Sequence, residues 1–564
     1  MKTFIQFLYF LLVGVAVMLP ATMQSQDILG GQVRGNVQID AQTYEPNDQI
    51  GITQEDINGE KVGMNAFGNF IYTNRNFTAG FRFESYLKPL VGFDREYEGL
   101  GIPYRFASYQ KDRFEITVGN FYDQFGNGLI FRAYEEWTLG YDNSVDGIRV
   151  KFNPFAGVTL KGIYGVQRYY WEKYSESNRG IVRGVDAEIS LNEMVGSWAE
   201  GKTKVIIGGA MVSKYQKDDP FFTYKLPENV SAFSGRFNIS NGRVNFLGEY
   251  AYKINDPSEI NNNIFKEGQA LFLSASYSQK GFGVTLGTKW IDNMSFKSDR
   301  TITGNSLDLS FLPPLTKVHS YSLEAMYPYA TQPNGEMALN GQIVYTLPKK
   351  SKLGGKYGTT LELNYTRINS IEKKPVDANT EISQAGTLGY ESAFFKFGDE
   401  LFFEDINIEL TKKISQKWKI ILAYTHLIYN FDVIEEGIET GDGHKFYTHV
   451  GVADITHKFN NKHALKLELQ YLQTKQDSGN WVAGLLEYTI APNWFFSVRD
   501  EYNFNNPETS NTYHYYSAAM GYTNGPNRIQ FSYGLQREGI LCVGGVCRRV
   551  PAASGFTIAI FSSF

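Results

Sequence analysis

The chain ends in Phe556-Thr-Ile-Ala-Ile-Phe-Ser-Ser-Phe564, and this stretch decides the fold. Read as a strand, it places Phe556, Ile558, Ile560 and Phe564 on one face, because strand side chains alternate with a period of two. The last strand of an outer-membrane β-barrel must pair with the first strand, so that no backbone edge is left unpaired in lipid. The apolar face and the terminal aromatic residue therefore predict a barrel-closing C-terminal strand.

The first 25 residues predict a secretory signal peptide. Lys2 supplies a positive charge, an apolar run extends from Phe7 to Leu19, and small or polar residues follow as far as Ser25. The run is too short to cross about 30 Å of hydrocarbon as a helix. We expect cleavage near Ser25 and a barrel over residues 26–564. Strand-like alternation begins soon after this site, so we expect no separate N-terminal plug domain.

The composition fits an exported barrel. Aromatic residues make up 15% of the chain, with 37 Tyr and 41 Phe, and there are 55 Gly. Only alternate residues of a barrel strand contact lipid, and aromatic residues gather at both membrane interfaces. The formal net charge is −5, and losing Lys2 with the signal would leave −6, so no basic surface for nucleic acid is expected. A soluble all-β protein is the alternative, which the terminal strand disfavours.

Period-two alternation dominates from residue 30 onward. Residues 463–471 and 528–535 each place apolar side chains on one face and polar or charged ones on the other. The apolar face should meet lipid, and the Lys, Glu, Arg and Gln rows should line the lumen. About 20 to 24 strand-like runs are present. Because such barrels have even strand numbers, the sequence predicts a single closed antiparallel barrel of about 22 strands, within a range of about 18–26.

The connections fall into two groups. Short turn sequences typical of hairpins should lie at the periplasmic rim; they begin at Asn153, Asn241, Lys280, Asn460, Pro492 and Asn524. Longer, more charged connectors should form extracellular loops; they cover residues 45–61, 255–266, 296–317 and 432–444.

Residues 84–149 break the regular rhythm, because charges of both signs alternate with Gly and aromatic residues. This suggests a loop folded into the barrel. Two interpretations stay open for its ionisable groups: a lumen constriction that selects solutes by charge, or a salt-bridge network that stiffens the wall. The candidate residues are Arg132, Glu135, Glu136, Asp142, Asp146 and Arg149.

Three segments together carry a family resemblance: residues 31–40, residues 118–149 and Gly544-Gly-Val-Cys-Arg548. With them the chain resembles an uncharacterised outer-membrane β-barrel family of Bacteroidota, classed as a domain of unknown function. The resemblance spans the mature chain and implies an outer-membrane barrel from that phylum. It implies no activity, substrate or catalytic residue.

The only two cysteines, Cys542 and Cys547, flank Val-Gly-Gly-Val. If Gly544-Gly545 forms a two-residue turn, the cysteines oppose each other in a non-hydrogen-bonded pair, with Cα atoms about 4.5 Å apart. The exported compartment is oxidising, so we expect a disulfide in the last extracellular hairpin. Two thiols alone make a poor metal site.

No constellation indicates catalysis, and no cofactor or metal is expected. None of the seven His lies in a metal-ligand pair or beside a nucleophile elbow. The first hypothesis is a porin-like channel for small polar solutes in the outer membrane of a Gram-negative bacterium. The alternative is a structural or accessory subunit of a larger outer-membrane complex for secretion, barrel assembly or surface-lipoprotein handling. The expected partners are outer-membrane lipids, the barrel-assembly machinery during biogenesis, and other outer-membrane proteins.

Overall fold

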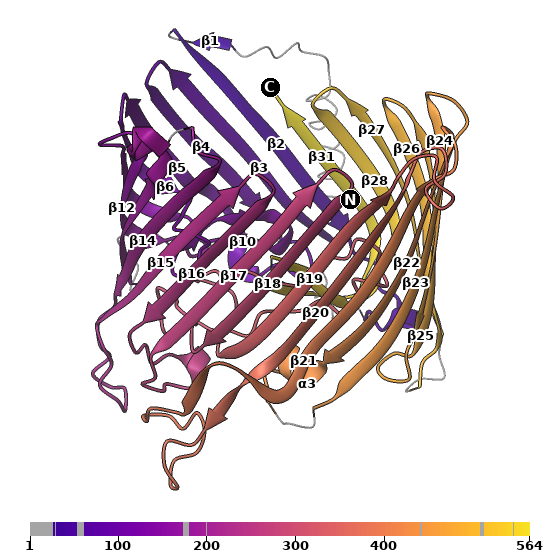
Figure 1. Cartoon of the computed structure of the whole chain (residues 1–564). Coiled ribbons are helices and arrows are strands. Elements are labelled where there is room, and N and C mark those ends of the chain that lie inside the picture. The colour runs from indigo at the N-terminus through magenta and orange to yellow at the C-terminus, as the bar shows by residue number, and fades with distance from the viewer. Residues whose placement is uncertain are drawn as a thin grey trace.

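The computed structural model describes residues 26–28, 30–53, 61–172, 180–198, 200–439, 443–507, 512–544 and 546–564. The predicted signal peptide lies outside these residues. The described chain forms one closed antiparallel β-barrel of 24 strands, close to the predicted 22 (Figure 1).

The barrel wall contains β2 (Gly31–Thr43), β3 (Val62–Asn74), β4 (Phe77–Tyr86), β5 (Gly99–Lys111), β6 (Phe114–Phe121), β11 (Val145–Phe152), β12 (Val158–Gln167), β13 (Ile181–Ser190), β14 (Thr203–Tyr215), β15 (Asn229–Asn241), β16 (Val244–Lys253), β17 (Gly268–Gln279), β18 (Phe282–Asp292), β19 (Gly335–Leu347), β20 (Thr359–Lys374), β21 (Glu391–Lys413), β22 (Trp418–Asn430), β23 (Lys445–Lys458), β24 (His463–Gln473), β25 (Asn480–Ile490), β26 (Trp494–Asn505), β27 (Tyr513–Asn524), β28 (Asn527–Gln536) and β31 (Ala553–Ser563).

The remaining elements are short. The strands are β1 (Gln26–Ile28), β7 (Asp123–Gln124), β8 (Arg132–Ala133), β9 (Glu135–Glu136), β10 (Tyr141–Asp142), β29 (Gly539–Val543) and β30 (Val546–Val550). The helical turns are η1 (Asp48–Ile50), η2 (Arg95–Tyr97), η3 (Trp137–Leu139), α2 (Leu191–Met194), η5 (Gly196–Trp198), η6 (Glu259–Asn261) and α3 (Phe431–Ile434). Among the described residues, no helix is both long and apolar enough to cross a membrane.

The C-terminal strand closes the barrel, as the sequence predicts. β31 pairs with β28 on one side and with β2 on the other, and Ile560 lies opposite both Ile529 and Ile39. The backbones of Phe564 and Gly35 exchange two hydrogen bonds of 3.0 Å. First and last strands are thus joined, and neither presents a free edge at this seam.

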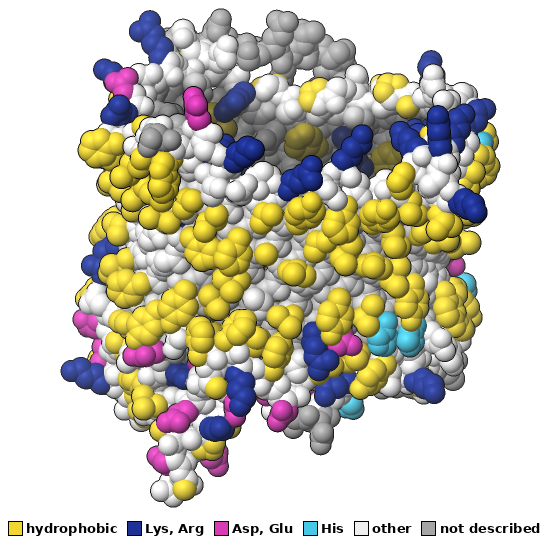
Figure 2. All heavy atoms as spheres, in the orientation of Figure 1, with side chains coloured by type: hydrophobic (Ala, Val, Ile, Leu, Met, Phe, Trp, Pro, Cys, Tyr) yellow, Lys and Arg dark blue, Asp and Glu magenta, His cyan; other side chains and the backbone are white. Residues whose placement is uncertain are grey.

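The outer face of the wall is apolar. Along β24, Leu467 and Leu469 are exposed on the outside, whereas Glu468 and Gln470 are buried on the inside. Along β26, Val498 is 60% exposed. Figure 2 shows the result as a broad band of hydrophobic side chains around the middle of the barrel, with Lys and Arg along the upper rim in that view. On the outer face, the alternating positions therefore carry apolar side chains, as predicted.

The two rims differ as predicted. All six short turns of the sequence analysis lie at one rim, together with the C-terminus, and all four longer connectors belong to the opposite rim. In Figure 1 the short-turn rim is at the top and the long-loop rim at the bottom. Part of two connectors, residues 54–60 and 440–442, lies outside the described chain.

Three segments from the long-loop rim fold into the lumen. They are the first insert (residues 122–144), the second insert (residues 293–334) and the third insert (residues 537–552). Each leaves the wall between strands that nevertheless pair directly: β6 with β11, β18 with β19, and β28 with β31. The inserts therefore occupy the interior without interrupting the wall.

The first insert is fixed by an apolar core. Phe125 and Leu129 to Phe131 are at most 1% exposed, and they pack against small inward-facing side chains of strands β13 to β17. Gly184 permits this approach, because a Cβ there would lie 2.8 Å from the Phe125 ring. At the tip, Gly126 has φ +54°, and the Glu249 carboxylate accepts the Asn127 N–H at 2.6 Å.

The second insert contributes to two cores. Its first part joins the core of the first insert through Met294, Phe296, Leu309 and Leu312, and residues 321–329 form another core on the opposite part of the wall. Leu323 and Tyr327 pack against inward-facing residues of strands β19 to β25, including Leu427 and Leu472. The expectation that polar rows line the lumen is therefore wrong for these sectors. Their inner wall is partly apolar because the inserts need a surface on which to bury their own apolar side chains.

An outward-facing charge tests the orientation of the wall. Val498→Arg is expected to lower the free energy of unfolding by about 2–4 kcal/mol, because an Arg near the bilayer midplane must leave water. The neighbouring Ser497 faces inward, opposite Glu487 of β25. Ser497→Arg should therefore have a much smaller effect. Urea unfolding in lipid vesicles measures both, and equal losses would contradict the assigned faces.

Candidate functional site

The candidate site is the sector of the lumen that the first two inserts leave uncovered. Their cores cover strands β11 to β18 and β19 to β25, respectively. The inner wall of β26 to β28, β31 and β2 faces the third insert instead. Figure 2 shows the barrel hollowed behind the short-turn rim.

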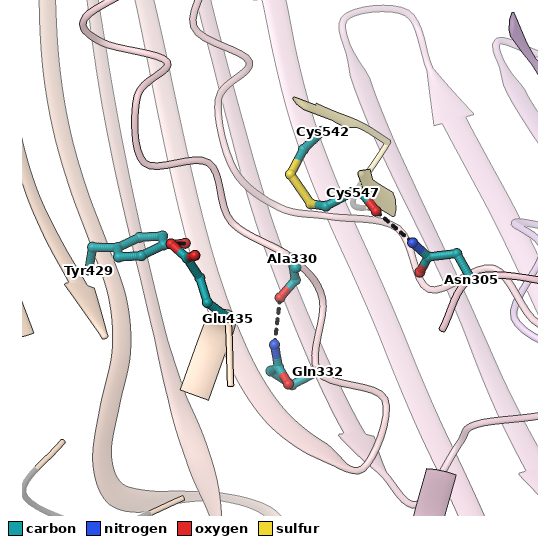
Figure 3. Close-up of a disulfide and its surroundings, with 7 residues drawn as sticks. All are labelled: Asn305, Ala330, Gln332, Tyr429, Glu435, Cys542 and Cys547. Carbon is teal, nitrogen blue, oxygen red and sulfur yellow. Dashed lines mark hydrogen bonds between the residues drawn. A yellow bond between two sulfur atoms is a disulfide. The ribbon is translucent and has the colours of Figure 1, made fainter. Parts of the chain in front are cut away.

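The third insert is a disulfide-closed hairpin. β29 pairs with β30, Cys542 lies opposite Cys547, and their Cα atoms are 4.0 Å apart. The predicted disulfide is thus confirmed, although the hairpin turns inward rather than out from the rim; Gly545 of the predicted turn lies outside the described residues. In Figure 3 the Asn305 amide of the second insert points to the Cys547 carbonyl, to which it donates at 2.6 Å.

The hairpin is attached far less firmly than the other two inserts. None of its described residues is buried. Besides the Asn305 contact, Arg548 donates to the Thr138 carbonyl at 3.0 Å, and Arg549 lies 3.5 Å from the Glu435 carboxylate. Polar contacts at partly exposed positions contribute little, whereas each buried core of the other inserts contains several large side chains.

A cavity of about 570 Å³ separates the hairpin from the wall. Four ionisable residues line it. Glu501 accepts hydrogen bonds from Arg499 and from Arg537, the latter at 3.2 Å. The polar residues around them are Gln42, Tyr515, Ser517, Ser532, Gln536 and Thr557, and the fourth ionisable residue is Arg548.

A second cavity of about 380 Å³ lies on the other side of the hairpin, among connectors of the long-loop rim. Its wall includes Phe93, Tyr97 and Tyr170. Arg548 lines both cavities, and its guanidinium lies 4.2 Å from the centre of the Phe93 ring. The hairpin therefore separates two spaces, and Arg548 lies at their boundary.

Two of the predicted site residues join a buried ionic network. Glu135 and Asp142 of the first insert both pair with Arg82 of β4, and Asp142 also pairs with Arg168 at 2.6 Å. Glu84 lies 2.6 Å from Arg82 and 2.7 Å from Arg168. Burial alone would raise the pKa of Asp142, but the two guanidinium groups outweigh burial and lower this pKa. Burial raises the pKa of Glu135, the surplus third carboxylate, to about 8.

Three other predicted residues lie inside the barrel but apart from this network. Arg132 is stacked between Tyr134 and Phe311, at 4.2 and 4.0 Å from their ring centres. Glu136 caps η3 by accepting from Thr138. Arg149 on β11 pairs with Glu115 at 2.6 Å. Arg132 thus joins the first insert to the second, Glu136 stabilises a turn within the first insert, and Arg149 links two wall strands. These three residues form no continuous ring of charge.

The prediction that these charges all face the lumen is wrong for Asp146. It lies on the outer face of β11, as Ile148 does two residues later, and pairs with Arg105 at 2.9 Å. Because strand side chains alternate, residues three positions apart point to opposite faces, so Asp146 must face outward when Arg149 faces inward. Asp146 is near the long-loop end of β11, where the Arg105 side chain is 54% exposed.

Sequence reasoning missed Arg82 and Arg168, the second insert, and the arginines of the lumen cavity. Arg82 lies 60 residues from Asp142 in the chain, and no local pattern links them. One feature of the sequence could have indicated an insert: Lys214, Lys253 and Lys289 occupy inward positions on every second strand. All three are wholly buried in the structure. Lys253 and Lys289 donate to second-insert carbonyls, at Ser295 and Pro313.

His319 links the second insert to the wall. It lies 3.0 Å from the Asp405 carboxylate and 3.5 Å from that of Glu324. Burial by itself lowers the pKa of His319, but the hydrogen bond to Asp405 and the nearby Glu324 carboxylate outweigh burial and raise the pKa to about 9. In the described part of the chain, no group of three or more His, Cys, Asp or Glu is arranged to hold a metal ion.

Comparisons with known proteins give a family and distant structural neighbours. A model described as "Family of unknown function (DUF6029)" matches residues 1–564. No curated protein matches the chain. The chain is similar to the siderophore receptor PirA from Pseudomonas aeruginosa, with 10% identity, 94% of this chain and 80% of that chain covered, and a TM-score of 0.39.

Two further solved structures also match the chain. The translocation pore of the P pilus usher PapC is 9% identical, with 94% of this chain and 99% of that chain covered and a TM-score of 0.37. A mutant of the Rh. blastica porin is 11% identical, with 60% of this chain and 93% of that chain covered and a TM-score of 0.24. The barrel assignment rests on the strand pairing of this chain itself.

The ionic network predicts a contrast between two arginines. Arg82→Gln is expected to lower the free energy of unfolding by about 3–5 kcal/mol, because it leaves buried carboxylates without their partner. Arg105→Gln breaks the half-exposed ion pair with Asp146 and should change the free energy of unfolding by about 1 kcal/mol or less. Adding Glu135→Gln to Arg82→Gln should restore part of the loss. Similar unfolding midpoints for the two single variants would contradict a structural role for the network.

The His319 contacts predict a pH dependence for the second insert. The pKa of His319 is raised from 6.5 to about 9, so its stabilising charge is fully present below about pH 6.5 and is lost as the pH rises through 9. The protection factors of residues 315–331, which correct hydrogen exchange for its intrinsic rise with pH, should fall between these values. His319→Gln should flatten the profile; an unchanged profile in that variant would exclude His319 as the cause.

Proposed function

This chain belongs to the family of unknown function that its full length matches, and we propose that it forms a gated, porin-like channel for small polar solutes in a bacterial outer membrane. The observation that carries the proposal is the weakly held hairpin between two cavities. A membrane location is supported by the outward apolar band and by the closed hydrogen bonding of the wall, which together suit a barrel in lipid.

The lumen supports a narrow passage rather than a wide pore. A wall of this strand number encloses a space that is either water-filled or plugged. Here two inserts fill most of it with buried cores, and the polar sector along β26 to β28, β31 and β2 stays uncovered. Solutes entering this sector from the short-turn rim would meet the third insert.

The third insert suits the role of a gate. Its contacts to other segments are mostly polar and partly exposed. The apolar surface that its displacement would expose is limited to Phe93 under Arg548 and the small cluster beside Ala552. The disulfide keeps β29 and β30 together while the hairpin moves as one unit. The wall beneath need not change, because β28 and β31 pair up to Gln536 and Ala553, where the insert begins and ends.

One observation favours the alternative, a structural or accessory subunit of a larger outer-membrane complex. β20 and β21 extend beyond the long-loop rim (Figure 1), and Leu388 and Phe394 in this extension are 59% and 57% exposed. Exposed apolar side chains at a rim suit contact with another outer-membrane protein. Fractionation in mild detergent separates the two functions, because a channel should run alone or as a homo-oligomer.

Shortening the gate tests the channel. Replacing residues 539–550 with two glycines keeps Arg537 and the β28–β31 pairing but removes the hairpin. We expect small or intermittent conductance for the unmodified protein in planar bilayers, and a conductance several-fold larger, on the order of that of an open pore, for the shortened variant.

The matched control shortens an unrelated loop of the same rim. Residues 219–223 make only local hydrogen bonds, and Phe221 is 95% exposed. Replacing them with two glycines should leave the conductance unchanged. If none of the three proteins conducts and other membrane proteins co-purify, the result would favour a subunit of a larger outer-membrane complex over a channel.

A further inference from the structure

We propose that the cavity between the third insert and the wall is a binding site for small anionic solutes, such as carboxylates or phosphates. This deepens the proposed function and rests on it, because it names the solute class of the same passage. The cavity, of about 570 Å³, lies within the range of sites for small organic molecules.

The charge balance of the cavity is positive. Its ionisable lining residues are three arginines and one glutamate. Glu501 is held by both Arg499 and Arg537, so it neutralises one of them and leaves an excess of two positive charges. The Arg499 side chain is 40% exposed, which leaves it accessible from the lumen.

Nearby carboxylates do not cancel this excess. Glu468 on the inner wall of β24 lies 2.7 Å from Lys466 and also accepts from Gln470 at 2.7 Å. Asp40 on β2 accepts from Gln38 at 2.7 Å and does not line the cavity. Within the cavity itself, Glu501 is the one carboxylate among the described lining residues.

Arg548 is the group that an anion would bind at the boundary of the two cavities. Its Nη2 donates to the Thr138 carbonyl, but Nε and Nη1 are buried with no hydrogen-bond partner among the described residues. No carboxylate of the described chain pairs with it, and its guanidinium rests on the Phe93 ring. A guanidinium with free donors is well suited to bind a carboxylate or phosphate oxygen.

The remaining lining residues would complete such a site. Ser517, Ser532 and Thr557 supply hydroxyl donors, and Tyr515 supplies another beside an aromatic face. Leu541 and Val550 of the hairpin make the opposite side apolar. This arrangement suits a small organic anion with one charged end.

The test is ion selectivity in planar bilayers. The reversal potential is measured under a tenfold KCl gradient, for the unmodified protein and for the variant with residues 539–550 replaced by two glycines. Chloride should be preferred over potassium by about fivefold or more in the unmodified protein, as expected for a pore lined by excess arginine. Arg499→Gln combined with Arg548→Gln should reduce the preference to about onefold.

The arginine substitutions have a matched control, and they leave the Glu501 carboxylate of the wall paired. Arg243→Gln removes the same charge at the short-turn rim, outside the cavity, and should leave the reversal potential unchanged. Arg499→Gln leaves Glu501 paired with Arg537, so the wall keeps a partner for its carboxylate. In the shortened variant, Arg499→Gln alone should lower the chloride preference.

The outcomes separate this inference from the proposed function. Conductance with no chloride preference, or with a preference for potassium, overturns the anion site while the channel stands. A chloride preference that the two arginine substitutions leave unchanged also overturns it. Absence of conductance even after the hairpin is removed overturns the channel itself, and the anion site with it.

Discussion

Every other feature of this protein depends on the hydrogen-bonded seam between its first and last wall strands. A backbone amide or carbonyl without a partner is too unfavourable to persist in hydrocarbon, so a sheet in lipid must close on itself. β31 provides that closure by pairing with both β28 and β2. Once the wall is closed, its apolar face is fixed outward, and chain segments that leave the rim can fold into the interior.

The interior then poses a packing problem, because wall side chains cannot fill so wide a barrel. The chain solves it with inserts of different kinds. The first two inserts bury large apolar side chains against an inner wall that is locally apolar. Ion pairs through Arg82 and His319, and the hydrogen bond from Lys289 to the Pro313 carbonyl, hold them in place. The third insert has a disulfide but no buried side chain in its described part. This difference in attachment is the basis of our proposal that the third insert acts as a gate.

The sequence predicted what local patterns can encode. Alternation identified the wall strands and their outer face, turn chemistry separated the two rims, and the spacing of Cys542 and Cys547 predicted their disulfide. The strand number was underestimated by two, since it was chosen only by counting runs and by parity.

Contacts between distant segments were beyond this reasoning. The network around Arg82 joins residues far apart in the chain, and the second insert was interpreted only as a long extracellular loop. Asp146 was placed on the wrong face because the six charges were treated as one cluster, although adjacent strand residues point to opposite sides. The arginines of the lumen cavity meet only when the C-terminal hairpin folds inward against β26 and β28.

The central claim is that the third insert moves while the second stays fixed, and a distance measurement tests it most directly. Spin labels carried on unnatural amino acids at Val543 and Val318 would leave the native disulfide intact, with Val318 and Lys352 as the reference pair. Electron–electron resonance should give a broad or two-peaked distance distribution for the first pair and a single narrow peak for the reference pair. A single narrow peak for both pairs would contradict a movable gate.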